Sequence, residues 1–511
     1  MKEFKSKSLK DLVEGSDGLF TLVQGDDNFP VNDICYDSRR VSEKSLFSAV
    51  EGFKSDGHDY IMLAYKSGCR AFLISSHKSS IISDYPDACF ITASESRVAL
   101  SRVSALFYGE VSKKIPVIGV TGTNGKTTVT YMIESVCKQA GMKPGVIGTV
   151  NYRWLKTVEP APNTTPESRD IHNIMARMMR DGVDVIIMEV SSHGLSLGRV
   201  DDVHFAIALF TNLTQDHLDF HKDFEDYYQA KKKLFDLLQK SEAPVTNRYA
   251  VINCDDKYGE RLVQELKGAA FELRDAGTGR GYYSLDPESV RAELSGISYH
   301  LNTPGASYDL DLHLTARFNI SNSLIAFGAL DGLGIDHDKI VKGLCSIESV
   351  PGRFDRIASP LGFYVVVDYA HTDDALVKLL KAAREINPRR LITVFGCGGD
   401  RDKTKRPLMG HAAVSLSDIA FVTSDNPRTE DPQAIVDDIL LGIKADDGNY
   451  EVIVDRSEAI KRAVYYANKG DLLVIAGKGH EDYQIIGTQK SHFDDKEVAA
   501  KFIEERVISE G

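Results

Sequence analysis

The stretch that decides the fold of this chain, residues 121–128, reads Thr-Gly-Thr-Asn-Gly-Lys-Thr-Thr. It lies between an apolar segment, residues 115–120, and a helical pattern. This order predicts a buried strand, a tight glycine loop and a helix whose N-terminus attracts an anion. Lys126 is then placed to reach the phosphates of a nucleotide, and the Thr127 hydroxyl to bind Mg²⁺. A strict phosphate-binding loop has Gly in place of Val120, so the motif is a variant, and a plain glycine turn is the alternative.

The bulk composition predicts a cytoplasmic protein of several domains. The 511 residues suffice for about three or four domains. A net charge of −13 without a long basic block argues against a nucleic-acid partner. No segment approaches the ~20 apolar residues of a membrane span, and the N-terminus lacks the apolar region of a signal peptide. The seven cysteines are scattered and never form CxxC, which favours reduced thiols.

Three blocks of sequence predict three α/β domains, at residues 1–109, 110–347 and 348–511. The first block has short alternating stretches and no glycine loop. The second alternates apolar and helical stretches, which predicts a doubly wound sheet with further strands at residues 183–188, 205–210 and 249–252. The third predicts a similar sheet, with strands at residues 363–367, 391–395, 419–422 and 472–475. Ligands bind at the carboxyl ends of the strands in such sheets.

Two polar segments follow strands of the second block. Glu189 follows the strand 183–188, where an acidic residue beside a phosphate loop can hold Mg²⁺ directly or through water. A solvated glutamate at a strand end is the alternative. Residues 211–221 gather Thr, Asn, Gln, Asp and His side chains after the strand 205–210. They predict metal-capable groups, with a polar loop and a capping Asp as the alternative.

The next predicted helix, residues 224–238, carries a lysine on its apolar stripe. Lys231 falls on that stripe, whereas Lys232 and Lys233 fall off it. One explanation is snorkelling, in which the ammonium reaches water. The other is a partly buried lysine with a lowered pKa, whose neutral amine reacts with CO₂ to give an anionic carbamate, a metal ligand.

Charged turns follow three strands of the third block, at residues 396–403, 425–428 and 477–481. Each turn taken alone could be a solvated connection. Three of them at the ends of neighbouring strands predict a shared binding cleft, because parallel strands present their carboxyl ends at one edge of the sheet.

Together these motifs resemble those of the Mur ligase family of ATP-dependent amino-acid ligases, which build the peptidoglycan stem peptide. The resemblance covers nearly the whole chain, from Asp37-Ser38-Arg39 to the Gly-Lys-Gly-His-Glu turn at 477–481. Residues 394–410 and the Asp-Asn-Pro-Arg turn at 425–428 match the branch that adds the third residue of the peptide.

The resemblance implies an N-terminal UDP-sugar-binding α/β domain, a central P-loop ATPase-like doubly wound sheet and a C-terminal Rossmann-like domain for the amino acid. It implies a monomeric, ADP-forming ligase of cell wall biosynthesis that uses ATP and Mg²⁺. This ligase would add meso-diaminopimelate to the D-Glu γ-carboxylate of UDP-N-acetylmuramoyl-L-Ala-D-Glu through an acyl phosphate.

The resemblance also implies roles for individual residues. Those that match the ATP site are Thr121, Gly122, Thr123, Asn124, Gly125, Lys126, Thr127, Thr128, Asn319, Asn322, Arg353, Asp368 and His371. Those that match the UDP-muramoyl-peptide site are Tyr36, Ser38, Lys54, Ser55, Asp56, Asn163, Thr164, Thr165, Ser191 and Arg199. Those that match the diaminopimelate site are Arg401, Asp425, Asn426, Pro427, Arg428, Gly477 and Glu481. The implied magnesium ligands are Thr127, Glu189, His217 and Lys231 as its carbamate, and the implied catalytic residues are Lys126, Lys231 and His217.

The chain departs from the family pattern at three positions. Leu197 stands where some members have a substrate-binding Gln, which puts one muramoyl contact in doubt. Asp373 replaces a usual Pro, and Ala316 replaces a usual Gly. None of the three belongs to the implied phosphate, metal or amino-acid groups, so we expect full activity.

Alternative functions are a ligase of the same type that adds L-lysine, a folate-polyglutamate type of ligase, and a nucleotide-dependent switch without ligation. Arg428 bears on the first of these, because its guanidinium can pair the carboxylate that diaminopimelate has and lysine lacks. Alternatively, Arg428 only closes its own turn against Asp425 or Glu430.

Overall fold

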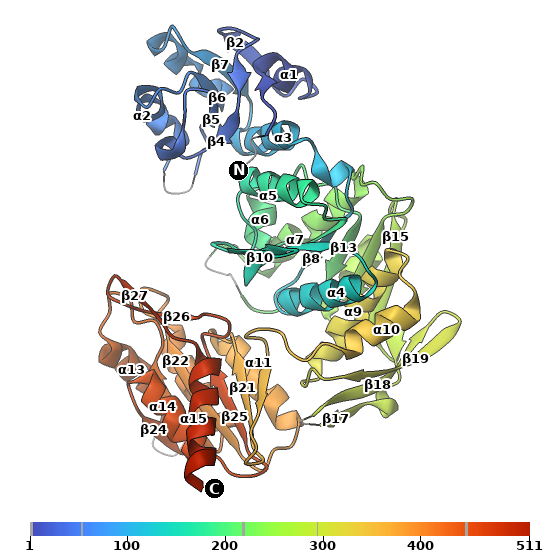
Figure 1. The fold of residues 1–511 in the computed structure, drawn as a ribbon, viewed down its shortest axis with the longest axis vertical. Helices are drawn as coiled ribbons and strands as arrows, with labels where there is room; N and C mark the ends of the chain where they lie inside the picture. Colours follow the sequence, from blue (N-terminus) through green and yellow to red (C-terminus); the bar gives the residue numbers. More distant parts are fainter. Residues whose placement is uncertain (1–3, 53–54, 217–219, 294, 445–447, 511) are drawn as a thin grey trace. The chain divides into compact units, whose positions relative to one another are not determined.

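The computed structural model describes residues 4–52, 55–216, 220–293, 295–444 and 448–510 of the chain (Figure 1). The chain divides into two compact units. The first comprises Met1–Lys126, Cys137–Asp275 and Gly328–Ile335, and the second comprises Thr127–Val136, Ala276–Phe327 and Asp336–Gly511. The predicted mixed α/β class is confirmed, whereas the three predicted domain boundaries stay a prediction.

The N-terminal part of the first unit is a five-stranded sheet. Its spatial order is β2 (Thr21–Gln24), β7 (Cys89–Ala93), β6 (Ala71–Ser75), β5 (Ser45–Ser48) and β4 (Asp33–Cys35). Strands β4 to β7 are parallel, and β2 is antiparallel to β7. The helices here are α1 (Leu9–Glu14), α2 (Ile61–Lys66) and α3 (Ser96–Tyr108), and β1 (Lys7–Ser8) pairs with β3 (Pro30–Val31).

The remainder of the first unit contains seven neighbouring strands. Their spatial order is β11 (Thr157–Pro160), β10 (Asn151–Trp154), β9 (Pro144–Ile147), β12 (Val185–Glu189), β8 (Val117–Thr121), β13 (Ile207–Phe210) and β14 (Tyr249–Asn253). The five from β9 to β14 run parallel. Val120 pairs with Glu189, and Thr121 pairs with Phe210. The carboxyl ends of β12, β8 and β13 therefore meet at one edge, which is where the predicted loop lies.

Helices connect these strands, as the doubly wound prediction requires (Figure 1). They are α4 (Lys126–Gln139), α5 (Ser168–Arg180), α6 (Ser192–Ser196), α7 (Phe224–Gln239) and α8 (Lys257–Glu265). Helix α7 begins where the Asp223 carboxylate accepts the Asp226 N–H over 2.8 Å, a standard N-cap. Its predicted stripe is buried from Tyr227 to Leu238, and Lys231 is buried with it.

The second unit contains a small antiparallel region and a second sheet. The small region contains β16 (Tyr283–Leu285), β17 (Arg291–Glu293), β18 (Gly296–Thr303) and β19 (Ala306–Leu312). Strand β15 (Glu272–Thr278), whose residues up to Asp275 belong to the first unit, runs parallel to β16. Helices α9 (Phe318–Gly332) and α10 (His337–Cys345) follow.

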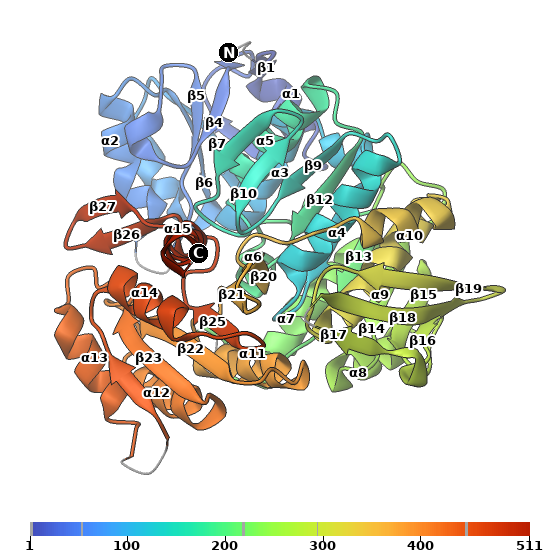
Figure 2. The same cartoon turned by 60° about the horizontal axis from the view of Figure 1, so that its bottom comes forward.

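The second sheet has six strands with helices on both faces. Its order is β20 (Asp355–Ala358), β21 (Tyr364–Asp368), β25 (Leu472–Ala476), β22 (Leu391–Cys397), β23 (Ile419–Ser424) and β24 (Tyr450–Val452). One apolar core lies under α11 (Asp373–Glu385), α12 (Lys405–Leu416) and α13 (Pro432–Leu440), and another under α14 (Arg456–Tyr466) and α15 (Asp495–Glu510). Figure 2 shows α12 and α14 on opposite faces of the sheet. A hairpin of β26 (Tyr483–Ile486) and β27 (Gln489–His492) follows β25.

All seven cysteines are free thiols. Among the described residues, each helix is too short or too polar to cross a membrane.

One prediction concerns the two-residue turn between β10 and β11. Leu155 has a φ of 48° there and is 53% exposed, although this left-handed backbone suits Gly and strains bulky residues. Leu155→Gly should raise the free energy of unfolding by about 0.5–1 kcal/mol, because the relieved strain exceeds the entropy that Gly adds to the unfolded chain. Lys156→Gly, at the neighbouring turn residue, should lower the free energy of unfolding, because Gly there adds entropy to the unfolded chain. Chemical denaturation measures both, and equal effects would contradict the strain argument.

Candidate active site

The glycine loop lies between strand and helix, as predicted. Strand β8 ends at Thr121, and helix α4 begins at Lys126. Gly122 has a φ of 147°, and a Cβ there would lie 1.8 Å from Thr211 Oγ1. A larger residue at this position would therefore force the loop away from Thr211, the residue that follows β13.

Polar groups after β13 hold the loop in shape. The Thr123 N–H donates to Asn212 O over 2.8 Å, and the Asn124 N–H donates to Asn212 Oδ1 over 3.0 Å. The Thr211 hydroxyl donates to Asn124 O over 2.5 Å. Part of the predicted polar segment 211–221 thus shapes the phosphate loop, and His217 lies outside the described residues.

Two lysine ammonium groups donate to one carbonyl oxygen of the loop. Lys126 Nζ and Lys231 Nζ each lie 2.8 Å from Gly122 O. Lys231 is 1% exposed, with its Nζ 4.5 Å from the centre of the Tyr227 ring. The snorkelling explanation is therefore wrong. Burial, and next the Lys126 charge, hold the pKa of Lys231 well below its ordinary value.

The Glu189 carboxylate is buried at the end of β12, with 1% exposure. The Thr149 N–H donates to Glu189 Oε1 over 2.9 Å, and the Thr149 hydroxyl donates to Oε2 over 2.8 Å. Thr149 Oγ1 also lies 3.0 Å from Thr164 Oγ1. Sequence reasoning missed Thr149, although it follows an apolar strand. Its relevance appears only when β9 and β12 are known to be neighbours.

The segment predicted to meet the muramoyl peptide lies against Glu189. The Thr165 hydroxyl donates to Glu189 O over 2.9 Å and accepts the Ser191 N–H over 2.9 Å. Arg199 Nη1 donates to Thr165 O over 2.9 Å. The structure therefore brings the residues from Asn163 to Thr165 together with Ser191 and Arg199.

The residues predicted to bind the UDP-sugar lie in loops of the five-stranded sheet. Tyr36, Ser38, Ser55 and Asp56 follow β4 or β5, whereas Lys54 lies outside the described residues. The Tyr36 hydroxyl donates to Asp170 Oδ2 over 2.7 Å. Asp56 Oδ1 accepts the His58 N–H over 2.9 Å. Both predicted polar groups thus have partners that orient them.

In the second unit, two asparagines near the start of α9 form a buried pair. Asn322 Nδ2 donates to Asn319 Oδ1 over 3.1 Å, and Asn319 Nδ2 donates to Thr315 O over 3.0 Å. Asn319 is 2% exposed and Asn322 is 5% exposed. The hydrogen bonds fix the orientation of both amides.

The predicted C-terminal ATP contacts gather around the end of β21. The Arg353 guanidinium lies 5.0 Å from the centre of the Tyr369 ring and 3.4 Å from Thr127 Oγ1. Asp368 accepts two backbone N–H groups, over 2.7 and 2.9 Å, and burial raises its pKa. His371 Nδ1 lies 2.8 Å from Tyr369 O.

The local geometry at Ala316 shows why Gly is usual at that position, and the geometry at Asp373 shows why an acidic residue fits there. Ala316 keeps a φ of 72°, the left-handed backbone for which Gly is usual. Asp373 is the first residue of α11, capped by Thr372, where a negative charge is favoured by the helix dipole. Nothing in the structure explains Leu197, which lies at the C-terminal end of α6.

The three charged turns meet at one edge of the second sheet. Cys397 pairs with Ser424, and Phe395 pairs with Ala476, so the parallel strands end together. Asn426 Nδ2 donates to Glu481 Oε2 over 2.8 Å. A Cβ on Gly477 would lie 2.7 Å from Asp425 Oδ2. The geometry therefore brings Asp425 and Glu481 together at this edge, whereas the shared binding cleft stays a prediction.

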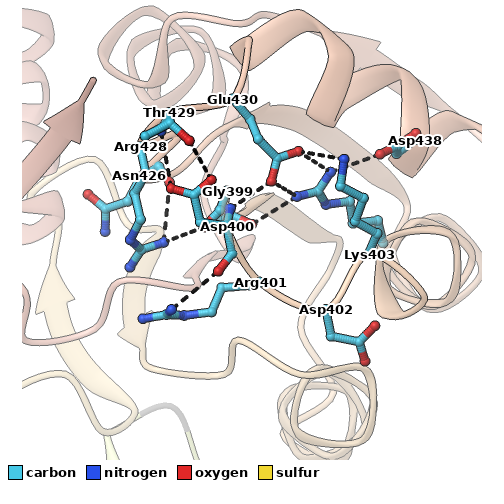
Figure 3. Close-up of polar contacts among 12 residues, drawn as sticks. Gly399, Asp400, Arg401, Asp402, Lys403, Asn426, Arg428, Thr429, Glu430 and Asp438 are labelled. Atoms are coloured by element: carbon cyan, nitrogen blue, oxygen red, sulfur yellow. Dashed lines mark hydrogen bonds and ion pairs between the residues drawn. The ribbon is translucent and has the colours of Figure 1, made fainter. Parts of the chain in front are cut away.

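Arg428 occupies a strained position in that site. Its φ is 52°, and its backbone N–H donates to Ile485 O of the hairpin over 3.0 Å. Its Nη1 donates to Gly399 O over 2.8 Å (Figure 3). Among the described residues, Arg428 forms an ion pair with neither Asp425 nor Glu430. The guanidinium does not close its turn against a carboxylate, which argues against the turn-closing alternative.

Arg406 and Glu430 support the glycine-rich turn. Sequence reasoning missed Arg406 and considered Glu430 only as a partner of Arg428. Arg406 is fully buried, and its two terminal nitrogens donate to Glu430 over 3.0 and 2.9 Å. Glu430 Oε1 also accepts the Asp400 N–H over 2.6 Å. These bonds, those from Arg406 first, lower the pKa of Glu430 from 4.5 to about 2. The Glu430 carboxylate therefore already has partners, and in Figure 3 Arg428 extends downward from its turn whereas Arg401 extends to the left from its own.

Three family models match the chain. They are the Mur ligase family catalytic domain at residues 30–108, the Mur ligase middle domain at residues 120–330, and the Mur ligase glutamate ligase domain at residues 352–479.

Curated relatives and solved structures resemble the chain over nearly its whole length. A relative from Clostridium acetobutylicum, UDP-N-acetylmuramoyl-L-alanyl-D-glutamate–2,6-diaminopimelate ligase 1, is 43% identical over 95% of this chain and 97% of its own. A relative of that name, without the number, from Geobacter metallireducens is 44% identical over 92% of this chain and 93% of its own. A solved structure of a ligase with the same name has a TM-score of 0.70 at 29% identity, covering 98% of this chain and 99% of its own. The folylpolyglutamate synthase of Mycobacterium tuberculosis, at 19% identity and a TM-score of 0.57 over 73% of this chain and 91% of its own, shares the fold.

The Glu430 contacts predict a pH dependence of stability. Its pKa is lower in the folded state, so its stabilising contribution is present above about pH 4.5 and is lost as the pH falls toward 2. Glu430→Gln should lower stability near neutral pH and flatten the loss of stability between about pH 5 and 2. Denaturation at several pH values measures this. Glu451→Gln, which breaks a surface pair with Arg462, is the control, and parallel pH curves for wild type and Glu430→Gln would contradict the argument.

Proposed function

The chain belongs to the Mur ligase family, and from this premise we propose that it is an ADP-forming ligase of peptidoglycan synthesis. It joins meso-diaminopimelate to the D-Glu γ-carboxylate of UDP-N-acetylmuramoyl-L-Ala-D-Glu, at the expense of ATP. The names of relatives at 43% and 44% identity support this. The observation that carries it is the site at the second sheet's edge, where Arg428 accompanies Asp425 and Glu481.

The reaction must bring two anions together. The γ-phosphate of ATP passes to the D-Glu γ-carboxylate and gives an acyl phosphate, which the diaminopimelate amine attacks. The products are the amide, ADP and phosphate. Lys126 and the N-terminus of α4 would stabilise charge on the transferring phosphoryl group. The ordered amides of Asn319 and Asn322, together with Arg353, Asp368 and His371, would hold the remainder of the nucleotide.

The residues fit a requirement for Mg²⁺. This cation prefers oxygen ligands, and the buried Glu189 carboxylate, already oriented by Thr149, is such a ligand. The Thr127 hydroxyl and His217 are the other proposed ligands on unmodified side chains. Bound there, Mg²⁺ would neutralise charge on the phosphates.

We propose that Lys231 is carbamylated. Its amine is buried, lies near the Lys126 charge and has a lowered pKa, so it loses its proton more readily than an ordinary lysine does. The neutral nitrogen forms a bond to the carbon of CO₂ and releases one proton, which leaves an anionic carbamate. This anion would supply an oxygen ligand for the metal and remove the repulsion between two neighbouring ammonium groups.

The rest of the proposal follows the family. The enzyme would act as a cytoplasmic monomer on small-molecule substrates. Residues 36, 38 and 54–56 would bind the UDP-sugar, and residues 163–165, 191 and 199 the muramoyl peptide.

The carbamate predicts a specific loss and rescue. Lys231→Ala should lower turnover by about 100-fold, the upper range for losing a group that tunes a metal site, and a small carboxylic acid should restore part of it. Lys232→Ala is the control, because Lys232 is the next residue of the same helix and pairs instead with Glu265 of α8. NMR with ¹³C-labelled bicarbonate should show a protein carbamate that Lys231→Ala lacks. A wild-type spectrum without that signal, with Mg²⁺ present, would refute the carbamate.

The choice of amino acid tests the proposed function. Lysine lacks the carboxylate that Arg428 would pair, so the wild type should prefer diaminopimelate on the order of a thousandfold, because a buried polar group would otherwise stay unpaired. Arg428→Ala should lose most of that preference. Amide formation with a panel of amino acids measures both, with Arg462→Ala, a surface arginine, as the control.

The outcomes of the panel separate the alternatives. Efficient ligation of lysine by the wild type would favour the lysine-adding ligase. Glutamate addition to a folate would favour the folate-polyglutamate type. ATP hydrolysis that no amino acid stimulates would favour the nucleotide switch.

A further inference from the structure

A buried ion pair lies behind the charged turns of the second sheet. Arg456 is the first residue of α14, and Asp495 is the first residue of α15. Arg456 Nε and Nη2 donate to the two oxygens of Asp495, each over 2.7 Å. The exposures of the two residues are 1% and 0%. Two parallel bonds of this kind fix the plane of the guanidinium.

The remaining guanidinium hydrogens reach two strand ends. Arg456 Nη1 donates to Ser424 O over 3.3 Å, and Nη2 donates to Ala476 O over 3.0 Å. Ser424 ends β23 and precedes Asp425, whereas Ala476 ends β25 and precedes Gly477. Strands β23 and β25 flank β22. One side chain therefore joins the starting points of two turns that the sheet hydrogen bonds do not connect directly.

Charged side chains of both signs surround this pair. Asp425 and Glu481 act on each other, and burial followed by the Asp425 charge raises the pKa of Glu481. Lys478 Nζ lies 3.7 Å from Glu481 Oε2. With Asp495 and Arg456, and with Arg428, whose charge also acts on Glu481, the cluster holds three carboxylates and three cations. A ligand ammonium placed between Asp425 and Glu481 would lower the repulsion between these two carboxylates.

We propose that Arg456, held by Asp495, is a positioning residue for the amino-acid site, and that it sets the separation of the turns that carry Asp425 and Glu481. This inference rests on the proposed function, because it assumes that an amino-acid ammonium binds between those carboxylates. Arg456 acts through the two strand-end carbonyls and does not itself contact the substrate.

The same sheet offers a matched control at its opposite end. Arg390 Nη2 lies 2.6 Å from Asp471 Oδ2, and the Asp471 side chain is fully buried. These residues directly precede β22 and β25. Substitutions in either ion pair should lower the stability of the protein to a similar extent. An effect on the amino-acid site should be confined to substitutions of Arg456 and Asp495.

The experiment compares Arg456→Lys and Asp495→Asn with Arg390→Lys and Asp471→Asn in the full-length chain. Arg456→Lys keeps the charge but loses the planar fork. Both variants of the first pair should raise the KM for diaminopimelate by roughly tenfold or more, the size typical of losing a supporting hydrogen-bond partner. The KM for ATP should stay within about twofold of wild type, because the P-loop keeps its own contacts. The control pair should lower the melting temperature without changing the KM for diaminopimelate.

Each result decides between the alternatives. An unchanged KM for diaminopimelate in a folded Arg456→Lys or Asp495→Asn variant would overturn the inference, as would an equal rise in the control pair. If Arg456→Lys does not fold, Asp495→Asn provides the same comparison. Failure of the wild type to ligate diaminopimelate would instead refute the proposed function. The assay of the wild type reveals this result independently of the variants.

Discussion

Parallel pairing of strands is the constraint on which both candidate sites depend. Strands β12, β8 and β13 end together because their residues are hydrogen-bonded in register. The same holds for β25, β22 and β23 in the second sheet. Each turn that leaves such an edge carries backbone N–H and C=O groups that have no partner in the sheet. These groups form hydrogen bonds with polar side chains instead. The shared edge therefore concentrates polar chemistry from segments far apart in sequence.

Buried charges are handled in two different ways in this protein. Arg456 keeps its charge because Asp495 and two carbonyl oxygens satisfy its donors. Lys231 has one carbonyl partner, Gly122 O, and lies near another ammonium. Removing a charge from water is costly unless it is paired. A paired arginine can serve as a rigid support, whereas a lysine in the position of Lys231 loses its proton more readily than an exposed lysine does.

Strained backbone is found where a turn carries a candidate site residue. Arg428 adopts a left-handed φ that costs on the order of 1–3 kcal/mol for a residue other than Gly. Two hydrogen bonds with the hairpin, from the Arg428 N–H to Ile485 O and from the Gly487 N–H to Arg428 O, hold that conformation. The turn is thus ordered before any ligand arrives, which reduces the entropy lost on binding.

The sequence by itself determined the features that arise from neighbouring residues. The glycine loop at 121–128 was predictable because strand, turn and helix signals are local. The apolar stripe of α7 was predictable, Lys231 included, because side chains three and four residues apart share one helix face. Four of the six strands of the second sheet, β21, β22, β23 and β25, were predicted close to their observed bounds, with ends one or two residues beyond the predicted apolar runs. The edge strands β20 and β24 were not predicted.

Only the tertiary structure decided how these segments meet. Thr149 with Glu189, Arg406 with Glu430 and Arg456 with Asp495 are separated by between 24 and 40 residues. Their pairing depends on strand order and helix packing, about which local periodicity carries no information. The same limit applied to Lys231. The sequence showed that Lys231 lies on the apolar stripe of its helix. Whether its ammonium reached water depended on how closely the loop at Gly122 packs against α7, and that distance is a property of the fold.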